Sequence, residues 1–462
     1  MGARDHGELT KSHNLLQRHR MDVALAFLQS LLYLVTSLFI ILMTSGWSDA
    51  AWLTGWGKRV KLTTDQLDID ADLTNFPILL YISASSGRNG NDISFVFDEL
   101  TSDDNRKKIA VTTSDGTTQC YVEIEKWDDA NEKAWLWVKA PSISGTVDTD
   151  LYLYYDHTHA DNTDHVGDPE SVAAVAVWDG NFKAVYHMQD YDTSNIHDTT
   201  SNNNDMAKTA AAEPAATTSG EIGNAQNYDG VNDYTHLTTS NFQFRPALEF
   251  WIKTTDTEAE PLEYSNYKDY YGWNFYFGYP SIKGKFMYAT SDGGTIASIT
   301  TTKTLNDGVF HHVVVTDDGA NLRLYVDGAL DVTAATGTPI WSDSRFYTGV
   351  ERPEYSIGVP FAGILDEIRI SNAVRSDAWI KATYETERDH LLVWGSEEGQ
   401  HSTYTTMVGN ASGWVWATIY STDTVNKVRS GGPTDWTWQT WTPGSGRKVP
   451  QGTAAAWTWS SE

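Results

Sequence analysis

The chain has 462 residues, a formal net charge of −28 at pH 7 and a pI of about 4.7, and this length accommodates two or three domains. No cluster of Lys and Arg is large enough to form the basic face of a nucleic-acid-binding protein, so we predict no nucleic-acid partner. Aromatic residues make up 12% of the chain, and short β-rich runs recur with almost no long helical periodicity after residue 60, which together predict an all-β protein.

An apolar segment, residues 23–43, follows a stretch that contains Lys and Arg. If this segment is the core of a signal peptide, cleavage falls near Ala50 and the protein is secreted. If it is not cleaved, it is long enough to remain as a membrane-anchoring helix. A buried core helix is disfavoured because no other predicted helix could cover it. Residues 1–50 are therefore predicted to be a signal peptide or a membrane anchor, which places the rest outside the cell or on its surface and limits membrane contact to this segment.

Residues 51–165 are predicted to form a first β-sandwich, because short alternating runs are separated by polar turns. The predicted strands cover residues 56–62, 75–82, 92–97, 121–125, 134–139 and 150–155. Cys120 is the single cysteine, so no intrachain disulfide can form. We interpret Cys120 as a small strand residue and not as a nucleophile.

Several motifs in this unit carry a family resemblance: Trp56…Arg59, Phe76-Pro77, Asp92-Ile93, Glu123-Ile124-Glu125, Trp135…Trp137, Pro141…Ile143 and Tyr154-Tyr155. They resemble the DUF2341 family, a β-sandwich module of unknown function found in exported bacterial and archaeal proteins. Asp156-His157 follow the last motif where the family usually has Gly-Asn, so we expect a different turn there. The resemblance implies location and fold and no particular activity.

Residues 166–176 are predicted to be a short linker. The segment before it groups His157, His159 and His165 with several aspartates, and such side chains are usual zinc ligands. The alternative is a solvated polar connection without a metal. We favour this alternative because spacing is the only support for zinc.

Residues 177–395 are predicted to form a second β-sandwich, and its clearest element is a hairpin over residues 308–328. Residues 313–316 are mostly β-branched and apolar, and apolar and polar residues alternate over 322–326. Asp318-Gly319 between them is a turn dipeptide that tolerates positive φ.

Further motifs occur in this second unit: Ala184–Met188, Ile222–Gly230, Phe250–Lys253, Phe361–Ile370 and Arg375–Ile380. Together with the hairpin they resemble the laminin-G-like (LamG), concanavalin A-like lectin/glucanase jelly-roll domains. The predicted architecture is thus two tandem β-sandwich or jelly-roll domains after an N-terminal hydrophobic helix. Because most such domains bind rather than catalyse, the resemblance implies recognition.

The sequence shows no catalytic constellation. Glycosidases need two carboxylates flanking the scissile bond, but Asp366 and Glu367 are adjacent in a predicted strand and are expected to face opposite sides. Glu123 and Glu125 alternate, yet they lie in the first unit. No nucleophile motif accompanies the Ser, His and Asp residues, so we predict that the protein is not an enzyme.

The laminin-G-like resemblance also implies calcium, because relatives with this fold often hold a structural ion near the two ends of the domain. Carried over to this chain, the expected ligands are Asp190, Asp229 and Asp366, and acidic loops supply the oxygens that calcium prefers. The alternative for Asp229 is a turn residue that caps its own backbone. For Asp366 the two interpretations remain open.

Candidate ligand-binding residues lie within residues 263–277: Tyr264, Tyr267, Tyr270, Tyr271, Trp273 and Tyr276. The apolar faces of sugars stack on aromatic rings, and sugar hydroxyls need a few directed polar partners, which the intervening Asn and Asp could supply. The alternative is that Trp273, Phe275 and Phe277 alternate along a strand and belong to the core.

Residues 396–462 form a Trp-rich, β-like C-terminal segment. Its seven tryptophans are Trp414, Trp416, Trp436, Trp438, Trp441, Trp457 and Trp459. The Trp-x-Trp spacing places both rings of a pair on one face of a strand. Stacking on glycans, cross-strand packing and docking on a partner remain open for these pairs.

The sequence therefore predicts an exported, non-catalytic protein that binds a polysaccharide or a surface glycoprotein and is stabilised by calcium. The alternative is a structural or assembly subunit of an envelope layer or surface filament, in which the sandwiches self-associate. A glycoside-active enzyme is the third hypothesis.

Overall fold

The computed structural model describes residues 50–399, except 190–194, 210–211, 238–241, 246, 266–270, 278–283, 293–294, 339–344 and 351–358, together with six strands between residues 402 and 461. The predicted signal peptide or anchor lies outside the described residues, apart from its last residue. No helix among the described residues is both long and apolar enough to cross a membrane. Contacts divide the chain into residues 1–51 and 52–462, and the fold described below is that of the second unit.

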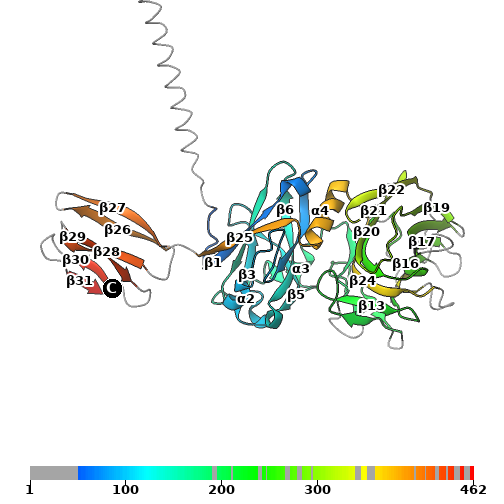
Figure 1. Cartoon of the computed structure of the whole chain (residues 1–462), viewed down its shortest axis with the longest axis horizontal. Coiled ribbons are helices and arrows are strands. Elements are labelled where there is room, and N and C mark those ends of the chain that lie inside the picture. The colour runs from blue at the N-terminus through cyan, green and yellow to red at the C-terminus, as the bar shows by residue number, and fades with distance from the viewer. Residues whose placement is uncertain are drawn as a thin grey trace, which may run out of the picture. The chain divides into compact units, whose positions relative to one another are not determined.

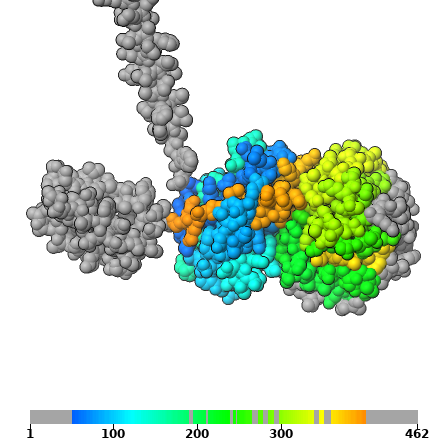
Figure 2. All heavy atoms as spheres, in the orientation of Figure 1, coloured from blue at the N-terminus to red at the C-terminus, as the bar shows by residue number. Residues whose placement is uncertain are grey.

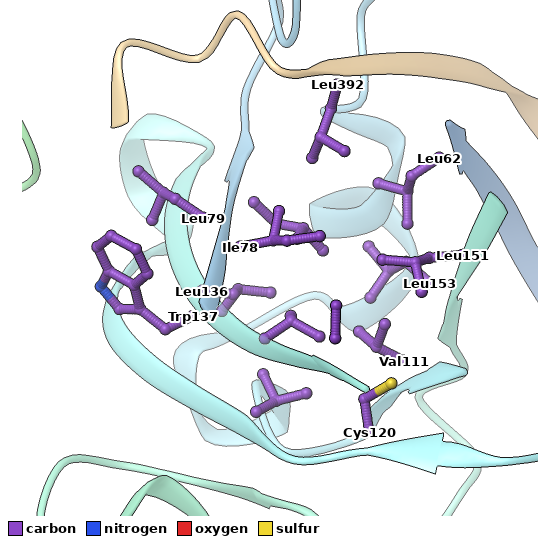
Figure 3. Packing of buried hydrophobic residues seen from close by; sticks show 14 of the residues in the cluster. Leu62, Ile78, Leu79, Val111, Cys120, Leu136, Trp137, Leu151, Leu153 and Leu392 are labelled. Atoms are coloured by element: carbon purple, nitrogen blue, oxygen red, sulfur yellow. The ribbon is translucent and has the colours of Figure 1, made fainter. Parts of the chain in front are cut away.

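The second unit begins with a sandwich of two sheets that enclose one apolar core (Figure 1). The five-stranded sheet has the order β25 (Leu392–Gly399), β1 (Lys58–Thr64), β7 (Thr149–Tyr155), β3 (Ile109–Thr112), β4 (Gln119–Cys120). The four-stranded sheet has the order β2 (Leu73–Ile82), β6 (Lys133–Ile143), β5 (Val122–Asp128), β8 (Val166–Gly167). Alternating residues of both sheets, among them Leu62, Ile78 and Leu136, meet between the sheets (Figure 3).

One predicted strand of this sandwich is a helix. The segment expected to be extended over 92–97 contains helix α2, Phe95–Leu100. Val96 and Leu100, four positions apart, are both buried, which fits one face of a helix. Over a run this short the two periodicities cannot be told apart in the sequence, and the strand prediction was wrong.

The chain returns to the first sandwich after it has formed the second one. Strand β25 pairs with β1 along its length, and Leu392 and Trp394 are buried in the first core. Helix α4, Asp377–Glu387, packs on β2, whose backbone donates a hydrogen bond to the Thr386 hydroxyl. In Figure 2 these orange residues lie against the blue and cyan residues of the first sandwich. The last two elements of the predicted unit 177–395 thus complete the first sandwich.

The predicted linker at 166–176 is also part of the first sandwich. It contains β8, which pairs in parallel with β5, and helix α3, Val172–Val175, which packs on β5. Between these two elements, Asp168 pairs with Arg106 and Lys107. The residues predicted as a linker therefore carry ordered elements and ion pairs of the first sandwich.

The second sandwich consists of two larger sheets around their own core. The outer sheet has the order β10 (Asn195–Ile196), β11 (Met206–Lys208), β14 (Thr235–Leu237), β23 (Arg345–Thr348), β16 (Ala259–Ser265), β17 (Tyr271–Phe277), β18 (Phe286–Asp292), β19 (Thr295–Thr300). The inner sheet has the order β12 (Ala215–Thr217), β13 (Ala225–Asp229), β24 (Ala362–Ser371), β15 (Ala247–Thr254), β20 (Phe310–Asp317), β21 (Asn321–Val326), β22 (Ala329–Ala335), with β9 (Phe182–Tyr186) also paired to β24.

The predicted hairpin is confirmed as β20 and β21, which pair from Val313↔Val326 to Asp317↔Leu322. Gly319 in the turn has a φ of 85°, a conformation that favours glycine. The C-terminal segment also contains strands, as predicted: β26 (Ser402–Asn410) with β27 (Gly413–Ser421), β28 (Asn426–Gly432) with β29 (Asp435–Trp441), and β30 (Lys448–Gln451) with β31 (Thr458–Ser461). The all-β, two-sandwich fold class is therefore confirmed.

Candidate functional site

The predicted sugar-binding tyrosines do not share one surface. Tyr264 and Trp273 are fully buried, and their ring centroids lie 5.5 Å apart inside the second core. Because β17 alternates, Trp273 points inward together with Phe275 and Phe277, as the alternative interpretation stated. These two candidates are core residues and cannot contact a ligand at the surface.

The other four candidates have different placements. Tyr276 is half-buried, on the opposite face of β17 from Trp273. Tyr271 begins β17, and its side chain is not described. Tyr267 and Tyr270 lie outside the described residues, so a ligand contact at these positions stays a prediction.

A row of polar and aromatic residues crosses the face of the outer sheet that is turned away from the core. In register across four adjacent strands these are His236 (β14), Tyr347 (β23), Glu263 (β16) and Asn274 (β17). Their strand neighbours, such as Leu237, Phe346 and Tyr264, belong to the core. Because side chains alternate along a strand, the four residues project from the opposite face. We call these four residues the outer row.

The outer row combines rings with hydrogen-bonding groups. The rings of His236 and Tyr347 are stacked, with centroids 6.2 Å apart and an interplanar angle of 21°, and Tyr234 packs at 5.7 Å from His236. The amide of Asn274 donates a 2.7 Å hydrogen bond to Glu260, which is also buried. Rings beside a carboxylate and an amide are the kinds of group that sugar sites use, although Glu263 and Asn274 are themselves buried here.

Exposure differs along this face of the outer sheet. The middle of the outer row is buried, at Tyr347, Glu263 and Asn274. His236 and Tyr276, on either side of it, remain partly exposed. These two rings are therefore the groups that a ligand from solvent would meet first.

The predicted calcium ligands do not assemble among the described residues. Asp190 lies outside them. Asp229 is exposed and accepts hydrogen bonds from the backbone N–H groups of Val231 and Asn232, so it caps its own turn. Asp366 is fully buried, and its carboxylate accepts hydrogen bonds from the backbone of Ile222 and Glu367. Neither Asp229 nor Asp366 belongs to a described group of three residues spaced for an ion, and calcium stays a prediction.

A second set of chemically active side chains lies buried where the two sandwiches meet. It consists of Glu123 and Glu125 on β5, His187 after β9, Glu249 on β15, His312 on β20, Glu367 and Arg369 on β24, and Glu387 at the end of α4. We call these eight residues the interface cluster. All of them are buried, so each charge needs a partner inside the protein.

Arg369 is the centre of the interface cluster. Its guanidinium donates to Glu249 at 2.8 Å, to Glu367 at 2.5 Å and to Glu387, and it lies 4.4 Å from the ring centroid of Trp137. Planar guanidinium groups suit such multiple pairing and ring stacking. Three indole N–H groups also donate to the carboxylates: Trp137 to Glu125 at 2.7 Å, Trp178 to Glu123 at 2.6 Å and Trp251 to Glu387 at 2.6 Å.

A bulge in β24 helps to place these groups. The pairing with β15 slips between Glu249↔Arg369 and Trp251↔Asp366, so β24 has one extra residue there. Glu367 has a φ of 47°, which is rare for a residue with a side chain. The sequence predicted that Asp366 and Glu367 face opposite sides of a regular strand, and it did not predict the bulge that interrupts the alternation along β24. Both are fully buried, and Glu367 reaches Arg369 and His187.

The pKa values follow from this arrangement. Burial alone would lower the pKa of His187, but the charges of Glu367 and Glu125 raise it well above its usual range. Burial, with the charge of Glu367, raises the pKa of Glu125 to about 8. Burial opposes ionisation of Glu367 too, yet His187 and Arg369 hold its pKa below the usual value. At neutral pH Glu367 is therefore ionised, while Glu125 holds its proton.

Two family matches follow the same order as the two sandwiches. Residues 89–203 match the domain of unknown function DUF2341, and residues 223–381 match the concanavalin A-like lectin/glucanases superfamily, Laminin_G_3. The chain carries a DUF2341 module followed by a laminin-G-like domain. The concanavalin A-like fold of that domain supports a binding role. No match to a curated protein was found.

Several solved structures are similar to this chain. Domain 4 of AbnA, a GH43 extracellular arabinanase from Geobacillus stearothermophilus in complex with arabinotriose, is 16% identical, with 44% of this chain and 97% of that chain covered and a TM-score of 0.36. The Ruminococcus gnavus IT-sialidase CBM40 bound to α2,3-sialyllactose is 14% identical, with 35% and 96% covered and a TM-score of 0.28. The binding domain of Paraclostridial Mosquitocidal Protein 1 is 12% identical, with 60% and 67% covered and a TM-score of 0.36.

The outer row and the interface cluster differ in how far they could be found from the sequence. Alternation within 263–276 could have revealed Glu263 and Asn274, because each stands between inward-facing aromatic or apolar residues. The interface cluster carries no such signal. Its members are spread from residue 123 to residue 387. Neighbouring strands of the inner sheet bring Glu249, His312, Glu367 and Arg369 together, and the packing of the DUF2341 module against the laminin-G-like domain adds Glu123 and Glu125.

Proposed function

We propose that the protein is an exported, non-catalytic glycan-binding protein whose laminin-G-like domain recognises a polysaccharide or surface glycoprotein through His236 and Tyr276, the partly exposed rings on either side of the buried middle of the outer row. The observation that carries the proposal is that His236 lies on one face of the outer sheet and stays partly exposed there, in register with the buried Tyr347, Glu263 and Asn274. Half-buried Tyr276 extends the same face, two residues along β17 from Asn274.

The chemistry of the outer row favours a neutral or cationic sugar face. Glu263 and Glu260 are buried carboxyl groups of β16 beside the row, and the protein as a whole carries a charge of −28. A strongly anionic glycan would have to approach against this charge. We therefore expect neutral polysaccharides to bind more tightly than sulfated or uronic-acid polymers.

A glycan array followed by calorimetry tests the proposal. Replacing one aromatic contact removes about 0.5–1.5 kcal/mol of ring interaction, which corresponds to a roughly 2–10-fold weaker Kd. We expect this loss for Tyr276→Ala and a comparable loss for His236→Ala. Tyr121→Ala is the matched control, because Tyr121 is 39% exposed on the DUF2341 module. It should leave affinity unchanged.

Two outcomes would replace the proposal. Assembly that depends on protein concentration, with no glycan bound on the array, would favour the structural subunit. Hydrolysis of a bound polysaccharide that is lost in Glu263→Gln would favour the glycoside-active enzyme.

Structural calcium and export are proposed with the binding function. Calcium add-back to chelated protein should raise Tm, and N-terminal sequencing of the expressed protein distinguishes a cleaved signal peptide, with a start near Ala51, from an anchor.

A further inference from the structure

Three members of the interface cluster converge on one buried point between the modules. Glu249 on β15, His312 on β20 and Glu387 at the end of α4 are 6%, 0% and 3% exposed, and their ligand atoms all lie within 4.8 Å of one another. Both ring nitrogens of His312 are buried without a hydrogen-bond partner among the described residues. Such an imidazole is unusual, because buried polar atoms are nearly always paired.

The separations within this trio suit metal ligands better than a hydrogen bond. The Nε2 atom of His312 is 3.5 Å from Glu249 Oε1 and 3.7 Å from Glu387 Oε2. Both values exceed the usual 2.7–3.2 Å range of N–H···O bonds. Ligands about 2.0–2.1 Å from a tetrahedral zinc ion stand roughly 3.3–3.4 Å apart. The trio is therefore close to the spacing that an ion between its atoms would require.

The carboxylates of the trio are already oriented by other groups. Glu387 uses Oε1 for Arg369 and turns Oε2 toward His312, and the Trp251 indole donates to this Oε2 at 2.6 Å. Outer-shell hydrogen bonds of this kind fix ligand orientation at metal sites. Arg369 pairs with Glu387 through the other carboxylate oxygen, but on Glu249 it donates at 2.8 Å to Oε1, the oxygen that faces His312. Each of the two ligand oxygens therefore already accepts one hydrogen bond, from Arg369 on Glu249 and from Trp251 on Glu387.

The interface contains more carboxyl groups than cationic side chains. Six buried carboxyl groups lie in or beside the interface cluster: Glu123, Glu125, Glu249, Asp366, Glu367 and Glu387. Against them, only His187, His312 and Arg369 among the described cluster residues can be cationic. Burial raises the pKa of two of the six, Glu125 and Asp366, and a proton on each leaves a smaller excess of negative charge for further protons or a bound ion to offset.

We propose that Glu249, His312 and Glu387 bind a zinc ion. An imidazole with two carboxylates is a usual donor set for zinc, and calcium is disfavoured because it takes six to eight oxygen ligands. A water molecule or a second carboxylate oxygen would complete the coordination. The ion joins α4, which packs on the DUF2341 module, to β15 and β20 of the laminin-G-like domain, and so ties the two modules together.

The test measures metal directly and does not depend on glycan binding. Protein expressed with zinc and purified without a metal-chelating tag should hold about one zinc per chain by elemental analysis, as a structural site does. After chelation, one equivalent of Co²⁺ should give the visible absorption of a tetrahedral ion, and Zn²⁺ should abolish it. Zinc should also raise Tm of the chelated protein.

The neighbouring histidines provide a matched pair of variants. His312→Ala and Glu387→Gln should weaken zinc binding more than 100-fold, beyond the 10–100-fold that an outer-shell change costs. His311→Ala should retain zinc, because His311 lies beside Asp307 and Asp327, away from the trio. If the His312 variant does not fold, the cobalt spectrum of the unmodified protein decides.

Absence of stoichiometric zinc together with absence of the cobalt absorption would overturn the proposal, and would mean that protons neutralise the cluster. Equal zinc content in the His311 and His312 variants would also overturn it. Failure of glycan binding would leave the zinc result unaffected, so the two proposals fail separately.

Discussion

Replacing Arg369 tests whether the interface cluster holds the two modules together. Arg369 pairs with carboxylates from β15, β24 and α4, and it is 2% exposed. Arg369→Met keeps an apolar stem over Trp137 and removes the charge. Removing one partner of a buried ion pair costs about 3–5 kcal/mol, because the remaining charge is left without compensation.

The loss of unfolding free energy in the Arg369 variant should be larger at high pH than at low pH. With Arg369 present, the pKa of Glu367 is held below its usual value, so this carboxylate stabilises the fold above its unfolded pKa and the contribution is lost in acid. Without Arg369 the folded-state pKa of Glu367 rises, and the folded variant binds more protons than the wild type. The destabilisation is therefore largest at pH 8 and smaller at pH 5.

Urea unfolding at both pH values measures this effect, with the fluorescence of the indoles beside Arg369 and circular dichroism as separate probes. At pH 8 we expect the free energy of unfolding to fall by about 3–5 kcal/mol. Adding Glu367→Gln to the Arg369 variant should recover part of the loss, which a double-mutant cycle quantifies. A loss below about 1 kcal/mol, the size of a surface ion pair, or an equal loss at both pH values, would refute the reasoning.

Three further predictions concern stability. A chain ending at Gly399 should keep the fold of the two modules. A chain ending at Glu387 lacks β25, which leaves the edge of β1 and the core beneath it uncovered. On a sizing column this shorter chain should not give a soluble, folded DUF2341 module. Burial raises the pKa of Asp389 to about 7, so the wild type loses stability as pH rises from about 4 to 7. Asp389→Asn should abolish this loss. At pH 8 its free energy of unfolding, measured by urea titration, should exceed that of the wild type by about 1–2 kcal/mol, a value reduced to allow for the partial exposure of Asp389. Gly349 has a φ of 91°, and a Cβ there would lie 2.4 Å from the Tyr228 ring, so Gly349→Ala should lower the unfolding free energy by at least about 1–3 kcal/mol; an unchanged urea midpoint would contradict that strain.

In the aromatic stretch at 263–277, the sequence pattern alone did not determine which side chains pack in the core. The sequence identified a concentration of rings, and chemistry alone suggested sugar binding. Alternation along β17 sends Trp273 into the core and leaves Asn274 and Tyr276 on the other face. Which of the two faces is buried depends on the sheet that packs against it, and a strand's own sequence is ambiguous when both faces carry aromatic residues.

Local patterns along the chain were enough to predict the fold class, the order of the two modules and the 308–328 hairpin, because alternation and turn chemistry act over a few neighbouring residues. Only the folded chain shows that α4 and β25 return to the DUF2341 module and that eight ionisable residues meet where the modules pack. Contacts across more than a hundred residues depend on which surfaces pack. A charged residue in a strand has the same local pattern whether it faces water or a buried partner.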